Sequence, residues 1–195
     1  MVGTNQGGVF IMKESKSRIW LEGAVAAALA MALSFVPVKF GPGFSVSLGM
    51  IPVIIYSFRR GTVAGLSSGL IWGLLHFLLG KAYILTASQA LIEYLLAYTF
   101  IGMAGLYAGK IRTAVVKGEI PWATLLLGVL VGTLSRYIWH YIAGVIFWGK
   151  YALWGLSPEM YSLVINGTSA VLTGVVTYIA LLLLIKKSPK LVIPN

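Results

Sequence analysis

The chain has 195 residues, of which 58% are apolar and 10% are charged, and its mean hydropathy is +0.90. Soluble domains carry about 25% charged residues, so this composition excludes a soluble fold and indicates an integral membrane protein. The chain has no cysteine, which excludes disulfides and cysteine-based metal or redox chemistry. We expect neither a metal site nor a cofactor. The interpretation of the net charge of +10 depends on where the basic residues lie along the chain.

Residues 1–12 precede the first apolar run and lack the basic segment and small-residue cleavage site of a signal peptide. We interpret them as a mobile N-terminal extension that is not part of the fold. The remaining residues, 13–195, contain no polar stretch long enough for a second domain. We expect them to form a single membrane domain.

Six apolar runs predict membrane-spanning helices, which need about 20 residues each. The predicted spans are 19–37, 44–58, 61–79, 86–108, 121–147 and 160–185. The second run is short and contains Pro52, so we expect it to be tilted or partly irregular where protein buries it. The expected fold class is all-α, with six transmembrane helices in one compact bundle.

The basic residues predict the orientation of this bundle. If the N-terminus is cytoplasmic, 11 of the 15 basic residues lie on the inner side. Lys39, Lys81 and Lys150 then lie outside, and Arg136 lies within a span. The positive-inside rule strongly favours this arrangement. We therefore predict a multi-pass protein of the bacterial plasma membrane with both termini in the cytoplasm. The positive charge then reflects the orientation of the chain in the lipid bilayer. We do not expect nucleic acid as a partner.

Small residues recur every four positions on two predicted spans, a spacing that lets helix backbones approach closely. For the glycines of the third span we expect packing within the bundle. For the alanines of the first span, internal packing and a surface that slides against a partner helix are equally open. The two sets are Gly61, Gly65, Gly69 and Gly73, and Ala24, Ala28 and Ala32.

Glu93 is the only acidic residue that interrupts a predicted span. A carboxylate in hydrocarbon is costly unless it is paired or faces a wet cavity, so an intramembrane Glu indicates a functional site. A protonated Glu93 bonded to a neighbouring helix is the alternative explanation.

Polar and aromatic side chains from four spans are predicted to reach the outer half of the membrane, whereas the inner half has almost none. This distribution favours a pocket that opens outward and is sealed from the cytoplasm. Simpler explanations remain open for single members: an interfacial aromatic belt, or a buried pair between Arg136 and Glu93. Besides Glu93, the set comprises Trp72, His76, Tyr83, Arg136, His140, Trp148, Tyr151, Trp154, Tyr161 and Asn166.

The residue types in this set indicate the chemistry of a ligand. Tryptophan and tyrosine faces attract organic cations, with about 2 kcal/mol or more for a desolvated contact. A carboxylate balances positive charge and accepts hydrogen bonds from an exocyclic amine, and asparagine and histidine bond ring nitrogens. The expected ligand is small, flat, partly aromatic and cationic.

Three stretches resemble the thiamine-specific S component of energy-coupling factor (ECF) transporters. They are Gly69–Gly73 with Gly80–Tyr94, His140–Ala152, and Tyr161–Gly167. In that family, six helices form a substrate-binding membrane subunit with an outward-facing pocket.

The resemblance implies roles for individual residues. Glu93 would recognise the aminopyrimidine, with Tyr161 and Asn166 beside it. Trp148 and His140 would enclose the two rings. Three further residues, Tyr94, Trp72 and Tyr83, would complete the pocket wall, with Arg136 nearby.

The resemblance also implies partners and two departures from the family pattern. Ala24 and Ala28 would dock on a transmembrane coupling subunit, which works with two ATP-binding subunits. The first outer loop has no tryptophan, so Phe40 or Phe44 would replace it as an aromatic lid. Arg136 stands where a lysine is expected, which keeps the charge and changes the geometry of any pairing with Glu93.

The expected function is high-affinity capture of thiamine outside and its delivery inward with the partner ATPase module. The chain has no phosphate-binding loop of the Gly-x-x-x-x-Gly-Lys-[Ser/Thr] type, so it is not predicted to be an enzyme. The alternatives are an S component for another cationic or heteroaromatic vitamin or a thiamine precursor, a proton-coupled secondary transporter, and a membrane enzyme using Glu93 and His140. The missing symmetry of two related halves argues against the secondary transporter, and the missing nucleophile or metal cluster argues against the enzyme.

Overall fold

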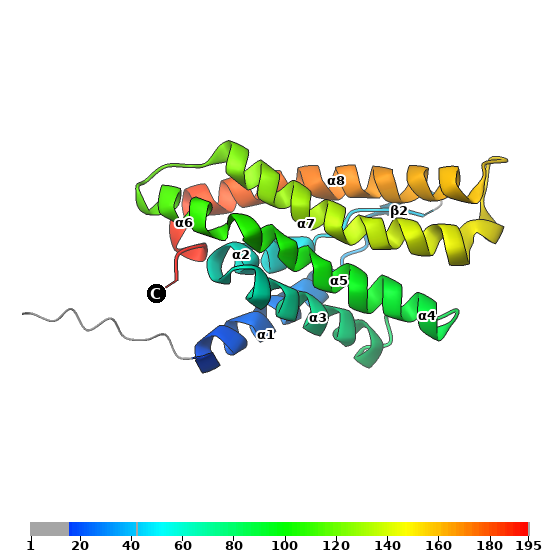
Figure 1. The fold of residues 1–195 in the computed structure, drawn as a ribbon, viewed down its shortest axis with the longest axis horizontal. Coiled ribbons are helices and arrows are strands. Elements are labelled where there is room, and N and C mark those ends of the chain that lie inside the picture. The colour runs from blue at the N-terminus through cyan, green and yellow to red at the C-terminus, as the bar shows by residue number, and fades with distance from the viewer. Residues whose placement is uncertain (1–15, 42, 195) are drawn as a thin grey trace, which may run out of the picture.

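The computed structural model describes residues 16–41 and 43–194, so the extension predicted over residues 1–12 lies outside the described residues. In the described part of the chain, the helices run side by side in one bundle (Figure 1). The first and the last described residues lie at the same end of that bundle. This arrangement confirms the prediction of an all-α bundle. The first three helices are α1 (Lys16–Leu33), α2 (Met50–Arg60) and α3 (Thr62–Leu78). The fourth helix is continuous and contains the segments α4 (Ala87–Ala90), α5 (Ala97–Phe100) and α6 (Ala108–Val116). The fifth begins with α7 (Trp122–Ala143), and the last is α8 (Pro158–Lys187).

The last three helices are the longest and most apolar. Ala87–Val116, Trp122–Tyr151 and Pro158–Lys187 each contain 30 residues and are long and apolar enough to cross a membrane. At about 1.5 Å per residue, each exceeds a hydrocarbon thickness of about 30 Å. The helices α1 and α3 are shorter, with 18 and 17 residues.

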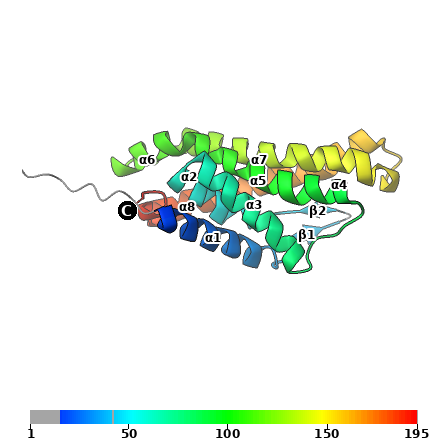
Figure 2. The same cartoon turned by 60° about the horizontal axis from the view of Figure 1, so that its bottom comes forward.

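The predicted second span, 44–58, is not helical throughout. Its first residues form strand β2 (Phe44–Ser45), which pairs antiparallel with β1 (Lys39–Phe40) on the side where α4 begins (Figure 2). The helix α2 has 11 residues and rises about 16 Å, too little to cross the bilayer alone. A continuous helical span over 44–58 is therefore wrong, whereas the expectation of partly irregular backbone is confirmed.

Side chains of α8 bond this irregular backbone. The backbone N–H of Ser45 donates to Ser169 Oγ at 3.2 Å, and that of Ser47 donates to Thr173 Oγ1 at 3.1 Å. Non-helical backbone at membrane depth requires such internal partners because lipid offers none. The hairpin is thus attached to α8 from the side.

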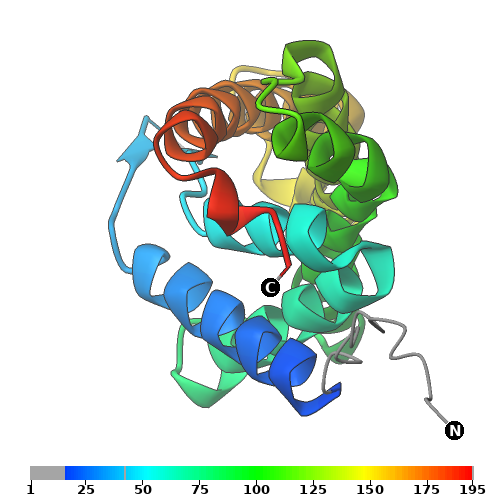
Figure 3. The ribbon, with the colours of Figure 1, turned by 90° about the vertical axis from the view of Figure 1, so that its left-hand side faces the viewer.

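The core lies around α2, which the other helices surround in the end-on view (Figure 3). Met50, Ile54 and Phe58 of this helix are fully buried, as is Trp72 of α3. The shortest helix of the bundle is therefore the central one.

The glycines of α3 form a close seam with the fourth helix. A Cβ added at Gly69 would lie 2.2 Å from the carbonyl oxygen of Tyr98, and one added at Gly73 would lie 2.0 Å from that of Tyr94. Both distances are shorter than any real side chain tolerates. The expected packing within the bundle is confirmed for Gly65, Gly69 and Gly73. It is not confirmed for Gly61, which precedes α3 and would have no atom within 4 Å of an added Cβ.

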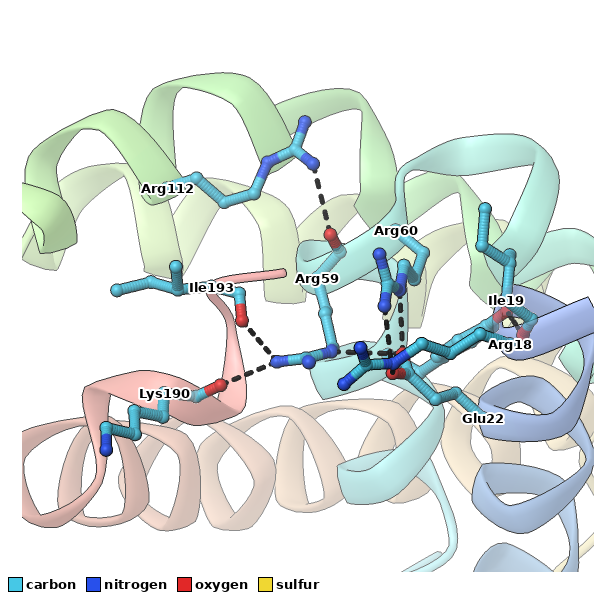
Figure 4. A network of polar contacts seen from close by, with 9 residues as sticks. Arg18, Ile19, Glu22, Arg59, Arg60, Arg112, Lys190 and Ile193 are labelled. Carbon is cyan, nitrogen blue, oxygen red and sulfur yellow. Dashed lines mark hydrogen bonds and ion pairs between the residues drawn. The ribbon is translucent and has the colours of Figure 1, made fainter. Parts of the chain in front are cut away.

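Charged residues join three chain segments at the end opposite the hairpin (Figure 4). Glu22 Oε2 accepts hydrogen bonds from Arg59 Nε at 3.0 Å and Arg60 Nε at 2.7 Å. Arg59 Nη1 also donates to the backbone carbonyls of Lys190 and Ile193. The network fastens α1 to α2 and to the C-terminal turn. Most of the basic residues lie at this end, which is the cytoplasmic end by the positive-inside rule.

Candidate ligand-binding site

A cavity of about 500 Å³ lies between the hairpin and the outer parts of the last three helices. This volume is typical of sites for small organic ligands. Hairpin residues, among them Lys39, Phe44 and Ser45, line one side. Of the nine residues to which the resemblance gives a role in the pocket, six line the cavity: Glu93, Tyr94, His140, Trp148, Tyr161 and Asn166. Tyr151, from the wider set predicted to reach the outer half of the membrane, lines it too.

Two donors hold the Glu93 carboxylate at the cavity wall. Trp148 Nε1 donates to Oε1 at 2.7 Å, and Gln89 Nε2 donates to Oε2. Among the described residues, no basic side chain lies within ion-pair distance of Glu93. A pair between Arg136 and Glu93, which the sequence left open, is therefore not formed. The carboxylate is oriented, and no described residue supplies a counter-charge to it.

Two π-helical segments shape the cavity, one on each side. Leu91–Leu96 carries Glu93 and Tyr94, and Gly144–Trp148 carries the indole that bonds Glu93. A π-helical turn inserts an extra residue and redirects side chains, and it often occurs at functional sites. The sequence shows no sign of either segment, and both were missed.

Gly144 allows the fifth helix to approach α8 closely. A Cβ at this position would lie 2.2 Å from Ser162 Oγ and 3.0 Å from Asn166 Nδ2. Ser162 Oγ in turn donates to the Tyr141 carbonyl at 2.8 Å. The glycine thereby places the polar groups of α8 at the cavity floor.

Asn166 and His140 are each oriented by neighbouring groups. Asn166 Nδ2 donates to Ser162 Oγ at 3.1 Å and to the His140 carbonyl at 3.3 Å. No donor in the described part of the chain bonds Asn166 Oδ1, which is left as an acceptor for a ligand. His140 Nε2 accepts from Arg136 Nε at 3.2 Å, so this nitrogen carries no proton and the imidazole is neutral.

Aromatic rings surround the outer part of the cavity. Phe44 stacks on Trp154, with ring centroids 6.4 Å apart at 18°, and Trp154 lies 5.8 Å from Tyr161. Phe40 also stacks on Phe44, with ring centroids 6.4 Å apart. Of the two phenylalanines expected to form a lid, Phe44 lines the cavity and Phe40 backs it.

The other three predicted residues do not line this cavity. Tyr83 is exposed at the rim, with its ring 5.6 Å from that of Trp148, and its backbone N–H donates to the Tyr94 hydroxyl at 2.9 Å. Trp72 is fully buried behind the wall. Arg136 lies 5.2 Å from the Trp72 ring and lines a neighbouring cavity.

Sequence reasoning missed several lining or supporting residues. Gln89 stands four positions before Glu93, and Ser162 four before Asn166, so each pair shares a helix face. That spacing could have identified both. The contribution of Ser45 and Lys39 depends on the hairpin, which was not predicted.

The alanine stripe of α1 faces outward. Ala24 and Ala28 are exposed, whereas Ala26, Ala27 and Ala30 are buried against the bundle. Internal packing therefore does not account for Ala24 and Ala28.

The bundle and its cavity define an integral membrane protein built around a site for a small ligand. The chain belongs to the thiamine transporter family, because the family model described as "Thiamine transporter protein (Thia_YuaJ)" matches residues 20–193. Membership confirms the resemblance to the thiamine-specific S component and shows a multi-pass protein of the cell membrane.

Individual relatives cover nearly the whole chain. Thiamine transporter ThiT of Lacticaseibacillus paracasei is 36% identical over 177 residues, which are 88% of each chain. ThiT of Bacillus subtilis is 36% identical over 187 residues, or 92% of this chain and 97% of the relative. A solved structure of ThiT from Listeria monocytogenes matches with a TM-score of 0.88 and 44% identity, covering 93% of this chain and all of that one.

Proposed function

We propose that this protein captures thiamine with high affinity at the outer face of the membrane and delivers it inward as the S component of an ECF-type transporter. The observation that carries the proposal is the oriented, uncompensated Glu93 carboxylate in a cavity lined by aromatic rings. Thiamine combines a flat aminopyrimidine with a permanently cationic thiazolium. The names of the relatives support thiamine as the transported molecule.

The cavity offers complementary groups for both rings. Each Glu93 oxygen accepts one protein hydrogen bond and retains lone pairs for the aminopyrimidine N–H groups. Asn166 Oδ1 and the Tyr161 hydroxyl would bond the same ring. Trp148 and His140 would enclose the two rings, and a desolvated cation–π contact with the thiazolium contributes about 2 kcal/mol.

The remaining predicted residues would act from the edges of the site. Tyr94 lines the cavity, and its hydroxyl holds the backbone of Tyr83 at the rim. Trp72 would act from behind, through its contact with Arg136. Arg136 in turn fixes the imidazole of His140.

ATP-driven transport would require partners because the sequence carries no phosphate-binding loop of the Gly-x-x-x-x-Gly-Lys-[Ser/Thr] type. We assign ATP hydrolysis to two ATP-binding subunits and their mechanical coupling to a transmembrane subunit. The exposed face around Ala24 and Ala28 would dock on that coupling subunit, because small side chains permit close helix contact.

Calorimetric titration of thiamine into the detergent-solubilised protein tests capture, and ATP-driven uptake into proteoliposomes with and without the partner module tests coupling. Saturable binding with uptake only in the presence of the module supports the proposal. Uptake driven by a proton gradient without ATP would instead assign the chain to the secondary transporters.

A further inference from the structure

A second cavity lies beside the first, under the hairpin. It has a volume of about 410 Å³ and is lined by the α1–β1 loop, the residues after β2, and the outer ends of α3 and α7. Lys39, Ser45 and Tyr94 line both cavities, so the two are neighbours that share a wall. The proposed capture of thiamine does not use this second cavity.

The charge of the second cavity is opposite to that of the first. Lys39, Lys81 and Arg136 line it, and no Asp or Glu does so among its described lining residues. Ion pairs between described residues join Arg18, Arg59 and Arg60 to Glu22, at the other end of the bundle. The cavity is thus cationic, and no described residue that lines it supplies a counter-charge.

Arg136 lies deepest of the three cations and is 5% exposed. Its Nη1 donates to Ser47 Oγ at 2.7 Å and its Nε to His140 Nε2, both neutral groups. A guanidinium has five N–H donors, so three of them have no acceptor in the described part of the chain. The Tyr98 ring, 4.4 Å from the guanidinium carbon, covers one face.

Burial of a cation without a compensating anion is strongly unfavourable. Cation–π contacts offset only part of this penalty. The free donors of Arg136 and the opening of the cavity therefore indicate a bound anion.

The two lysines lie at the rim of the cavity, on two different segments. Lys81 is exposed; its Nζ donates to the Ser34 carbonyl at 2.9 Å and lies 4.0 Å from the Phe35 ring centroid. Lys39 is exposed on β1. A cationic rim above a buried guanidinium concentrates anions at the entrance.

We propose that this second cavity binds an anion of the phosphate class, with Arg136 at its floor and Lys39 and Lys81 at its rim. Planar guanidinium donors match phosphate oxygens in a bidentate arrangement. The phosphate has two possible sources. It is either free inorganic phosphate, or the phosphate of an ester whose cationic rings occupy the first cavity; only the second source rests on the proposed function.

Titration of sodium phosphate into the solubilised full-length protein, with ionic strength held constant by gluconate and binding followed by phosphorus NMR, tests the free source. We expect saturable binding that weakens about tenfold to hundredfold in Arg136→Met and persists in Arg136→Lys. The double variant Lys39→Met/Lys81→Met should weaken it about two- to tenfold. It alters only exposed side chains and so supplies the result if Arg136→Met does not fold. Lys150→Met, a cation on the same side that lines neither cavity, should leave it unchanged.

Calorimetry with thiamine and thiamine monophosphate tests the ester source. Loss of affinity for the monophosphate in Lys81→Met, whose side chain lines only the second cavity, with thiamine affinity unchanged, supports that source. The proposal is overturned if phosphate gives no saturable signal and Lys81→Met affects both ligands equally. Failure of the parent protein to bind thiamine would refute the proposed function and leave the phosphate titration valid.

Discussion

Trp148 and Glu93 are joined by a hydrogen bond of 2.7 Å from the indole Nε1 to the carboxylate Oε1, although they are 55 residues apart. Each stands in a π-helical segment, and the bond connects these segments across the cavity. This bond therefore fixes both the position of the Trp148 ring and the orientation of Glu93, the one carboxylate among the described residues that line the cavity. Loss of either partner affects the other.

Replacement of Glu93 by glutamine keeps the shape of the side chain and removes its charge. We expect thiamine affinity to fall about a hundredfold or more, because a charge-assisted hydrogen bond and the counter-charge of the thiazolium are both lost. Isothermal titration calorimetry measures this change. Glu159→Gln, an exposed carboxylate at the start of α8, is the matched control and should bind like the parent. Parent-like binding by Glu93→Gln would refute the assigned role.

Trp148→Phe separates the aromatic face from the N–H donor. Phenylalanine keeps a ring against the ligand and leaves Glu93 Oε1 without its partner, so we expect about a tenfold loss of affinity. Trp139→Phe is the control, since this indole packs on Phe100 and lines neither cavity. An equal loss in both variants would show a general packing effect.

Gly144→Ala tests the close approach that places α8 at the cavity. The new methyl group would meet Ser162 Oγ, whose rotation would break its bonds to the Tyr141 carbonyl and Asn166. We expect a destabilisation of about 1–3 kcal/mol together with weaker thiamine binding. Thermal unfolding in detergent and calorimetry measure the two effects. Gly109→Ala, with no atom within 4 Å, should be neutral or stabilising.

Glu22→Gln weakens the cytoplasmic network without touching the cavity. The loss of charge-assisted bonds to Arg59 and Arg60 should destabilise the protein by about 2 kcal/mol. Thermal unfolding should show a lower midpoint, whereas thiamine affinity stays unchanged. Glu119→Gln, in an exposed loop, should shift neither quantity. A change in affinity would mean that the network acts on the binding site.

Tryptophan at Ala24 or Ala28 tests the docking surface. Both positions are exposed, so a bulky side chain should leave thiamine binding intact and abolish uptake by the assembled transporter. Ile138→Trp, on the exposed face of α7, controls for added bulk toward lipid. Loss of binding together with uptake would contradict a surface role.

Much of the bundle was predictable because each long apolar run must satisfy its backbone internally. Glu93 was also identifiable from the sequence, because a charge in such a run is unfavourable unless it is paired or faces a wet cavity. The glycine seam followed from the four-residue spacing of Gly69 and Gly73, and the structure confirms it. These features depend on composition and periodicity within one helix.

Features that depend on contacts between segments were not predictable. The hairpin is stabilised by hydroxyls of Ser169 and Thr173, which lie more than a hundred residues away in the chain. The π-helical turns add a residue without any change in hydrophobic pattern. Arg136 donates hydrogen bonds to Ser47 and His140. The spacing of residues on its own helix could not predict which of the possible partners it binds.

The contacts of Arg59, one of the arginines that bind Glu22, predict what happens when the C-terminal segment is removed. Arg59 uses the same guanidinium to bind the backbone of Lys190 and Ile193. Deletion of everything after Lys187 would remove both carbonyl acceptors and leave Arg59 Nη1 without these two hydrogen bonds, whereas the bonds from Arg59 and Arg60 to Glu22 would remain. Affinity tags are therefore better appended beyond the last residue than substituted for this segment.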